Sequence, residues 1–524
     1  MASGRGFWLA WGMVGFACGG AAGSEGSETG GPLTTGGETT VTDTTVTGSG
    51  DVPTTNGPSN TGGSDTGTSL PLPTTGGETT VDATSDTTAD TTDGTTGVPV
   101  EGGVWDRYLE SNGACGLDVD GAGNVYVLNR SARVDKLDPS GNTVWTQDFA
   151  CFAGVSLGSQ DPCYIDVNAA GEVAIAGLFS EDCTIGDDVM LHDADWMDVY
   201  LARLDPAGAP LWARPFGGND GETQLADGVA IDDAGDVAIL LTFDNAVDVG
   251  AGVWPATGEP FQSDIAVARY VGATGAYQWG IQWKGEETDE GGVLAVNAAG
   301  TLLVSAQVTD AFSFLGDDHS DPSGFSDPRL HLVALGPGGD VVWQRLFDNI
   351  DAGIFSGEIA DDGRALFGAN YDGQIDFGTG LVGNDAGAAF LLFLDPAGVT
   401  TKVSQITDVY SYLSDVRFVP GGRVAISGVY GGSMTIGGVA LPQIPNDRMF
   451  VAVTDESGAH LWSGAYGDDA ESFASESVTG LGVDASGRLA ITGDFEETID
   501  FGLGLHHSPG SFGTTYVALL DPAL

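Results

Sequence analysis

Three short motifs in this chain have the residue types and spacing of catalytic or binding sites. Gly154-Val-Ser156-Leu-Gly158 matches the G-x-S-x-G elbow, in which a serine attacks an acyl group, and Gly378-Thr-Gly380-Leu-Val-Gly383 matches the phosphate-binding pattern G-x-G-x-x-G. Asp118-Val-Asp120-Gly121 has carboxylates spaced as at the start of a calcium loop. The first two motifs need a helix directly after them, and the third needs later ligands that are missing. We therefore expect loops and turns at all three positions and assign no catalytic residue.

A larger set of potential ligands consists of acidic residues that follow a recurring tryptophan segment. They are Asp220, Glu222, Glu286, Glu287, Asp289, Glu290, Asp348, Asp351, Asp468, Asp469 and Glu471. Carboxylates gathered on one surface would bind a divalent cation such as calcium, or a cationic partner. The alternative is that they only form the solvated surface of an acidic protein. The six histidines are scattered and no C-x-x-C pair occurs, so the sequence predicts no other metal site and no other cofactor.

These acidic residues belong to a unit that recurs seven times from residue 103 onward. Each unit has a turn glycine followed by apolar residues at alternate positions, such as Val125 and Val127, which is the pattern of half-buried β-strands. The turn glycines are Gly123, Gly171, Gly235, Gly300, Gly363, Gly422 and Gly487. A tryptophan follows a second glycine by four residues in most units, namely at Trp145, Trp212, Trp279, Trp343 and Trp462. The fifth unit has Lys402 at this position.

A hairpin between the second and third strands is a further marker, clearest in Ile375-Asp-Phe-Gly378 and Ile499-Asp-Phe-Gly502. The first unit lacks it, which explains why the first turn-glycine spacing is 48 residues whereas the later spacings run from 59 to 65. Each unit is therefore predicted to form four short antiparallel strands, the blade of a β-propeller. The expected fold is all-β, a single seven-bladed β-propeller over residues 103–524.

The two ends of the repeat region predict how the ring closes. The seventh unit stops at residues 520–522 without a tryptophan strand of its own. Val104-Trp105-Asp-Arg107, which precedes the first unit, is similar to that strand as it occurs in Val342-Trp343-Gln-Arg345. We expect this N-terminal strand to complete the last blade and so to leave no open sheet edge.

The propeller arrangement predicts which residues share a face. Connections from the fourth strand of one blade to the first strand of the next lie on one face, so the acidic residues should form a rim there. Cys115, Cys151, Cys163 and Cys183 also fall in loops on this face. In an exported chain, four cysteines within about 70 residues predict two disulfides, with four buried thiols as the alternative. The sequence leaves their pairing open.

The unit also resembles known repeats. Tryptophan-containing outer strands at this spacing are similar to bacterial SBBP-type β-propeller repeats over about 420 residues, and the first unit is similar to an NHL blade. The G-x-x-x-W pattern, seen in Gly275-Ala-Tyr-Gln-Trp279, resembles the tryptophan-docking motif of quinoprotein dehydrogenases. Those enzymes have eight blades and a set of quinone and calcium ligands that this sequence lacks, so we expect the tryptophans to pack between blades. The resemblance implies a fold and no particular activity.

The first 102 residues predict an export signal and a tether. Arg5 precedes an apolar run, Phe7 to Ala17, that is too short to span a bilayer. Ala17-Cys18-Gly19 resembles the lipobox of bacterial lipoproteins, in which the cysteine is lipidated, although the two preceding residues differ from that pattern and cleavage after Ala22 with loss of Cys18 stays open. We expect a signal peptide at residues 1–17 and a disordered Thr/Gly/Ser/Asp-rich tether at residues 18–102, because so few large apolar side chains cannot form a core.

Charge and export together bound the function. The formal net charge of -57 argues against nucleic acid as a partner, since binding it needs clustered positive charge. We expect a monomer of the cell envelope of a Gram-negative-type bacterium, lipid-anchored at the outer membrane or cell surface, or secreted if Cys18 is not lipidated. Its expected role is non-enzymatic binding of a protein or glycan. The alternative is an enzyme acting on a polysaccharide or small molecule at the central channel, which convergent carboxylates there would favour over a lining of Ala, Gly and Val.

Overall fold

The computed structural model describes the repeat region with several gaps. The described residues are 102–109, 113–149, 151, 163–179, 183–186, 190–191, 198–217, 224–258, 262–320, 328–348, 352–406, 411–442, 444–467, 476–508 and 514–523. The expected signal peptide and tether, and the G-x-S-x-G motif, lie outside these residues. Every regular element within them is a β-strand, and they include no helix long and apolar enough to cross a membrane.

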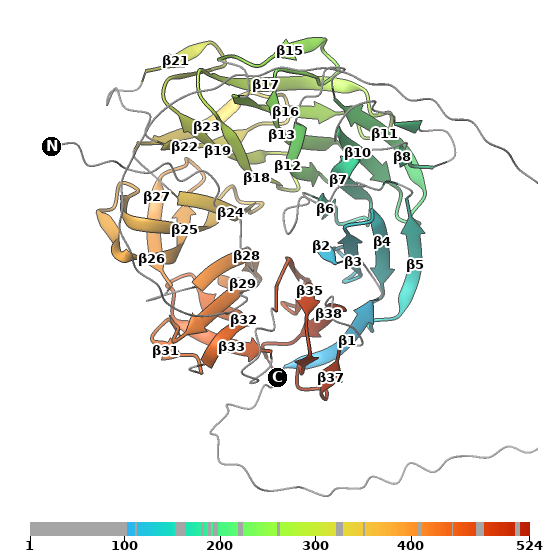
Figure 1. Ribbon diagram of the computed structural model, residues 1–524, viewed down its shortest axis with the longest axis vertical. Helices are drawn as coiled ribbons and strands as arrows, with labels where there is room; N and C mark the ends of the chain where they lie inside the picture. The colour runs from blue at the N-terminus through green and yellow to red at the C-terminus, as the bar shows by residue number, and fades with distance from the viewer. Residues whose placement is uncertain are drawn as a thin grey trace, which may run out of the picture. The chain divides into compact units, whose positions relative to one another are not determined.

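Seven antiparallel sheets form the blades of a ring (Figure 1). Each blade contributes four strands, and the sheet of blade 3 is extended to six by the hairpin strands of blade 4 at residues 312–314 and 317–319. From the innermost strand outward, blade 1 contains β2 (Ala114–Val119), β3 (Val125–Asn129), β4 (Arg133–Leu137) and β5 (Thr143–Asp148). Blade 2 contains β6 (Cys163–Val167), β7 (Val173–Phe179), β10 (Asp198–Leu204) and β11 (Pro210–Phe216). Blade 3 contains β12 (Gln224–Ile231), β13 (Val237–Asp244), β16 (Ser263–Tyr270) and β17 (Tyr277–Gly285).

The remaining blades repeat the same order. Blade 4 contains β18 (Glu290–Val296), β19 (Leu302–Thr309), β22 (Pro328–Leu335) and β23 (Val341–Phe347). Blade 5 contains β24 (Ala352–Ile359), β25 (Ala365–Asp376), β26 (Leu381–Leu394) and β27 (Thr400–Gln405). Blade 6 contains β28 (Ser411–Val419), β29 (Arg423–Gly432), β32 (Ile444–Asp455) and β33 (His460–Tyr466). Blade 7 contains β34 (Gly480–Val483), β35 (Leu489–Phe495), β38 (Thr514–Leu520) and β1 (Gly103–Leu109).

The predicted hairpin between the second and third strands is confirmed in blades 2 to 7. Its separate strand pairs are β8 (Cys183–Thr184) with β9 (Met190–Leu191), β14 (Ala246–Asp248) with β15 (Val253–Pro255), β20 (Phe312–Phe314) with β21 (Asp317–His319), β30 (Thr435–Ile436) with β31 (Val439–Ala440), and β36 (Thr498–Ile499) with β37 (His506–His507). In blade 5 the far ends of β25 and β26 form it. The G-x-G-x-x-G segment is the turn of this hairpin, as expected, with the Asp376 carboxylate accepting from the amides of Gly378 and Gly380.

The predicted closure of the ring is also confirmed. β1 pairs antiparallel with β38, so that Arg107 lies opposite Val517 and Leu109 opposite Thr515. The turn between these two strands is divided between the two ends of the described chain, where the Asp521 amide donates to the Gly102 carbonyl at 2.7 Å. The last blade is therefore held by segments about 400 residues apart in the sequence.

Hydrophobic side chains fill the space between neighbouring blades. On β3, Val127 packs with residues of blade 7, whereas Tyr126 packs with residues of blade 2. Both faces of the middle strands are therefore buried, which differs from the half-buried strands that the alternation predicts. The reason is that a blade in a closed ring has a neighbour on each side.

The tryptophans pack between blades, as predicted. Trp145 lies against Gly208 in the turn of blade 2 and donates its indole N–H to the Pro206 carbonyl at 3.2 Å. Trp105, Trp212 and Trp279 make the same bond to the turn of the next blade. At the tryptophan position of blade 5, the Lys402 ammonium donates to the Glu456 carbonyl at 3.1 Å instead. These contacts form a ring of clamps around the outer strands.

Candidate functional site

The four cysteines form two disulfides between blades 1 and 2. Cys115 pairs with Cys163, with 5.7 Å between their Cα atoms, and Cys151 pairs with Cys183 at 4.4 Å. The predicted disulfides are therefore confirmed, but three of the cysteines do not lie in loops as expected. Cys115 and Cys163 lie in the inner strands β2 and β6, and Cys183 lies in the hairpin strand β8. Both bonds reinforce the junction at the one blade that lacks a hairpin.

The predicted acidic rim is described only in part. Asp220, Glu222, Asp351, Asp468, Asp469 and Glu471 lie outside the described residues. Glu286 and Glu290 are exposed, and Glu287 accepts a hydrogen bond from the Gln262 amide at 2.9 Å. Asp348 is about half exposed, at 48%, and forms an ion pair with Arg329 at 2.7 Å. The exposed members thus lie after β17, at the start of β18 and after β23.

Asp289 corrects the expectation of a wholly exposed rim. Its side chain is fully buried, and its carboxylate accepts the Thr309 amide at 2.9 Å. Burial, with smaller contributions from Asp264 and Glu287, raises the Asp289 pKa to about 8. The cause is local, because the connection before β18 folds back under the end of blade 3, where the Asp289 amide also donates to the Ser263 carbonyl. This carboxyl therefore holds a connection in place and is not part of the solvent-facing rim.

The densest group of charged side chains lies around the ring axis. Asp118 of β2, Asp166 of β6, Glu358 of β24 and Arg417 of β28 each precede their turn glycine by five residues. Equal register on the innermost strands places them at one level of the ring. Asp415, two residues before Arg417, faces the same way and binds its guanidinium. We call these five residues the axial cluster.

Each carboxylate of the axial cluster accepts a backbone N–H from the next blade. Asp118 accepts the Val167 amide at 2.7 Å, and Asp166 accepts the Ile231 amide at 2.6 Å. The remaining two bonds run from the Phe418 amide to Glu358 and from the Leu481 amide to Asp415. The inner edge strand of a blade has no further strand to pair with, so these carboxylates satisfy its amides and join neighbouring blades.

The protonation of the axial cluster follows from its burial. Burial, reinforced by the Asp166 charge, raises the Asp118 pKa well above its ordinary value, and burial also raises that of Asp166. Burial raises the Glu358 pKa to about 7, against the opposing effect of Arg417. Burial would lower the Arg417 pKa, but the surrounding carboxylates outweigh it and raise that pKa, so the guanidinium stays charged.

Asp118 and Asp166 are neighbouring carboxyl groups on adjacent inner strands, and each affects the pKa of the other. Burial raises the pKa of both groups, which favours their protonated forms. Among the described residues, no three His, Cys, Asp or Glu side chains are arranged to hold a metal ion. The arrangement therefore places carboxyl groups with raised pKa values around the charged Arg417 guanidinium at the axis.

Sequence reasoning did not single out the axial cluster, although a signal existed. When the seven turn glycines are aligned, the position five residues earlier holds Asp118, Asp166, Ala230, Ala295, Glu358, Arg417 and Gly482. Four charged residues at one repeat position of a propeller predict a charged ring. In the sequence Asp118 is part of a calcium-loop pattern, whereas in the structure Asp120 caps the following turn and Asp118 faces the axis.

Comparison with known proteins adds little about function. No protein-family profile matches the sequence. The regulatory protein FlaEY of Caulobacter vibrioides is 25% identical over 341 residues, which cover 58% of this chain and 34% of that protein. The chain thus spans about a third of the length of this curated relative.

Solved structures with a similar arrangement include several propellers. The Cps50 (Swd1) β-propeller domain of Myceliophteria thermophila is 9% identical with a TM-score of 0.40, covering 79% of this chain and 98% of that one. BamB from Moraxella catarrhalis is 14% identical with a TM-score of 0.34, again covering 79% and 98%. At these values the likeness concerns the fold alone, which the strand pairing of this chain establishes by itself.

Proposed function

We propose that this protein is an exported, lipid-anchored surface protein whose propeller is a non-enzymatic scaffold for a protein or glycan partner. The observation that carries the proposal is the bonding of the axial carboxylates. Each of them accepts an amide of the neighbouring blade, so the groups best suited to acid-base chemistry hold the ring together. Recognition is then left to the loops and hairpins at the two faces.

The disulfides support the exported location. Disulfides form and persist in oxidising compartments and are rare in the reducing cytosol. Two of them at the junction of blades 1 and 2 fit a protein that folds after export. In this proposal Cys18 carries the lipid, residues 18–102 form the tether, and the propeller stands at the outer membrane or cell surface of the cell envelope. Without lipidation of Cys18 the same protein is secreted.

Charge defines the expected partner. A chain with a formal net charge of -57 attracts cationic groups and calcium and repels nucleic acid. Glu286 and Glu290 are exposed in the connection between blades 3 and 4, at the end of β17 and the start of β18, where they can meet a cationic group of a partner directly. A monomeric propeller on a long tether would present this surface freely.

The test is a binding screen of the full chain against envelope glycans and secreted proteins, with and without calcium. We expect at least one partner whose affinity falls as salt rises and falls further in the double variant Glu286→Gln/Glu290→Gln. Asp205→Asn, which changes an acidic residue in a turn of blade 2, serves as the matched control. Binding to none of these partners under any condition would overturn the scaffold proposal.

The second candidate is an enzyme at the ring axis, favoured by the neighbouring carboxyl groups of Asp118 and Asp166, whose pKa values are both raised. Two neighbouring carboxyl groups are the arrangement of an acid-base pair. Asp118→Asn keeps the hydrogen-bonding shape of the side chain but removes the acid. Turnover of a polysaccharide or small molecule that this variant abolishes would support the enzyme, whereas partner binding that survives the substitution supports the scaffold.

The anchor has a separate test. In a host that processes lipoproteins, the full chain should incorporate radiolabelled palmitate and sediment with membranes. Cys18→Ser should lose the label and release the protein into the soluble fraction. A labelled Cys18→Ser variant, or an unlabelled natural chain, would contradict the proposed lipidation.

A further inference from the structure

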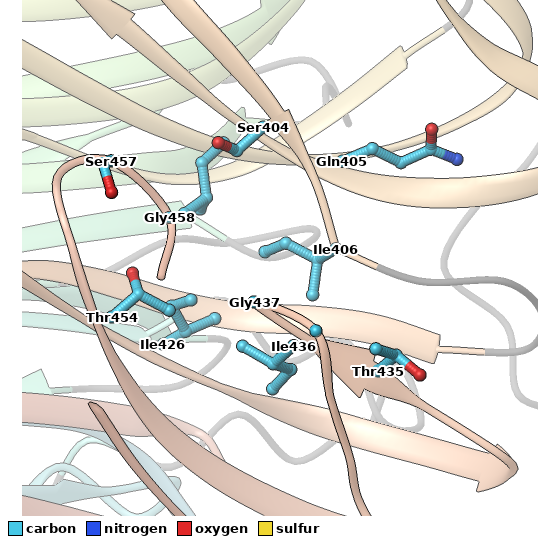
Figure 2. Close-up of a pocket in the computed structure, with 12 residues that line it drawn as sticks. Ser404, Gln405, Ile406, Ile426, Thr435, Ile436, Gly437, Thr454, Ser457 and Gly458 are labelled. Carbon is cyan, nitrogen blue, oxygen red and sulfur yellow. The ribbon is translucent and has the colours of Figure 1, made fainter. Parts of the chain in front are cut away.

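The interface between blades 5 and 6 contains a pocket of ≈ 430 Å³ (Figure 2). This volume falls in the range of about 300–1,000 Å³ that is usual for small-molecule sites. Ile406, which follows β27, and Ile436 of the β30–β31 hairpin face each other across it (Figure 2). Ser404, Thr454 and Gly458 also line the pocket.

The pocket exists because blade 5 lacks a ring that other blades supply. Blades 1, 2, 3, 4 and 6 also pack against a following blade that has a hairpin. Four residues after the tryptophan position, these blades carry an aromatic residue: Phe149, Phe216, Trp283, Phe347 and Tyr466. These rings pack against the hairpin of the next blade, as Phe347 does against Phe377 with centroids 5.1 Å apart. Trp283 with Phe314 and Tyr466 with Phe501 are equivalent ring pairs. At the interface of blades 5 and 6 the corresponding residues are Ile406 and Ile436, so neither side provides a ring.

A second difference between blade 5 and other blades also enlarges the pocket. Two residues after the tryptophan position, Arg107, Arg214 and Arg345 donate to a carbonyl in the turn of the next blade. Blade 5 has Ser404 there, beside Gly458 of the corresponding turn. A serine leaves empty the volume that a guanidinium fills after blades 7, 2 and 4, whereas blades 1, 3 and 6 have Gln147, Ile281 and Gly464 at this position.

The wall of the pocket also contains a buried hydroxyl group, that of Thr454. The Thr454 side chain is 3% exposed, and its hydroxyl has no hydrogen-bond partner among the described residues. Buried hydroxyls are nearly always hydrogen-bonded, because an unpaired one costs free energy. An occupant that combines an aromatic ring with a polar edge would fill the space between Ile406 and Ile436 and pair with Thr454.

We propose that this pocket is a docking site for a tryptophan or tyrosine side chain of a partner protein. The ring takes the place that the chain's own aromatic residues take at the other hairpin-bearing interfaces, and its N–H or O–H group bonds to Thr454. The expected tether cannot supply this ring, because residues 18–102 contain no Phe, Trp or Tyr. The site names the partner group of the scaffold function proposed above, on which its biological role rests.

The experiment measures binding of three capped amino acids to the full chain by saturation-transfer NMR and titration. N-acetyl-tryptophanamide and N-acetyl-tyrosinamide should bind, with N-acetyl-leucinamide at least tenfold weaker. Ile406→Phe supplies the ring that the pocket lacks and should weaken binding of both aromatic amides at least tenfold without lowering the thermal midpoint. Leu211→Phe, which adds the same ring at an exposed position of blade 2, should change nothing.

Two further variants keep the proposal falsifiable. Ser404→Arg restores the residue type of Arg107, Arg214 and Arg345 and should also block binding. Thr454→Val removes the hydroxyl but keeps the shape, and should weaken binding of the aromatic amides about fivefold. Equal affinity of the natural chain, Ile406→Phe and Ser404→Arg for the aromatic amides would overturn the proposal, as would equal binding of the leucine amide.

The same variants separate this inference from the scaffold proposal. If the aromatic amides bind in the pocket but no partner is found in the screen, the proposed pocket site stands and the scaffold function is refuted. A partner that binds the natural chain and Ile406→Phe equally well would leave the scaffold function and overturn the docking role of the pocket. Self-association of the natural chain that Ile406→Phe abolishes would make the occupant a second copy of this chain and overturn the assignment to a different protein.

Discussion

At the scale of single residues, the axial cluster combines structural and titrating roles. Arg417 lies among Asp118, Asp166, Glu358 and Asp415, and its charge offsets only part of theirs. The pKa of Glu358 is raised to about 7 by burial, whereas a glutamate in an unfolded chain titrates near ~4.3. The folded protein therefore retains a proton that the unfolded chain releases between these two values.

This retained proton determines how the free energy of unfolding depends on pH. The contribution of Glu358 to the free energy of unfolding should be greatest below its unfolded pKa and should fall as pH rises from about 4.3 through about 7. We expect Glu358→Gln to reduce this fall by about 1–3 kcal/mol, because the amide cannot ionise but still accepts the Phe418 amide. Urea unfolding at a series of pH values measures it, with Glu286→Gln as the control for loss of one exposed carboxylate. Identical pH profiles for Glu358→Gln and the natural chain would contradict the assignment.

At the scale of elements, the tryptophan clamps explain the second glycine of each unit. Gly208 has a φ of +85°, and a Cβ atom there would approach the Trp145 ring to 3.0 Å. Gly378 has nearly the same backbone conformation, at +90°, but a Cβ atom there would meet nothing within 4 Å. The two glycines therefore share a conformational requirement and differ in the indole contact.

Substitutions at these two glycines measure how much a tryptophan clamp contributes to the free energy of unfolding. Gly378→Ala should lower the free energy of unfolding by about 1 kcal/mol, the cost of a positive φ for alanine. Gly208→Ala should cost about 2–4 kcal/mol, because the new methyl group also displaces the Trp145 indole. Chemical denaturation of both variants measures the difference. Equal losses would show that the indole contact adds nothing to stability.

The two disulfides act on the connection between neighbouring blades. Cys115 and Cys163 close a loop with a sequence separation of 48 residues, and Cys151 and Cys183 one of 32. We expect Cys115→Ser/Cys163→Ser to lower the free energy of unfolding by about 2–4 kcal/mol by freeing the unfolded chain. Denaturation under oxidising and reducing conditions measures this loss. A reductant that destabilises this variant as much as the natural chain would contradict a stabilising role for the Cys115–Cys163 bond.

At the scale of the whole molecule, stability depends on closing the ring with β1. Without β1 the edge of β38 is unpaired, and Trp105 no longer reaches the turn of blade 1. Because every blade is buried between two neighbours, opening one junction exposes apolar surface on two blades.

Deletion of residues 103–110 tests this dependence. We expect the thermal midpoint of the full chain to fall by at least about 10 °C, since blade 7 would lose a strand and one clamp. Deletion of residues 74–81, an octamer of the same length outside the repeat region, is the control and should leave the midpoint unchanged. A midpoint unaffected by loss of residues 103–110 would refute closure by β1.

Much of the architecture could be predicted from the sequence because it is repeated locally. The turn glycines, the alternating apolar residues and the tryptophans recur along the chain, so seven blades, the missing hairpin of blade 1 and the closing strand could all be counted. Cysteine number indicated two disulfides. Lys402 departs visibly from the tryptophan pattern, whereas Ser404 and Ile406 stand out only when they are aligned with the equivalent residues of the other blades.

Only the tertiary structure decided which residues meet. The partners of an inner-strand carboxylate, such as Val167 for Asp118, lie on the next blade, and the pairing of Cys115 with Cys163 also crosses a blade junction. The burial of Asp289 and the pocket between Ile406 and Ile436 likewise depend on how two blades approach each other. The sequence alone determined the repeat, because strand patterns are local. The sites could be seen only in the closed ring, because the burial and the charged surroundings of a residue at a junction depend on side chains from both blades.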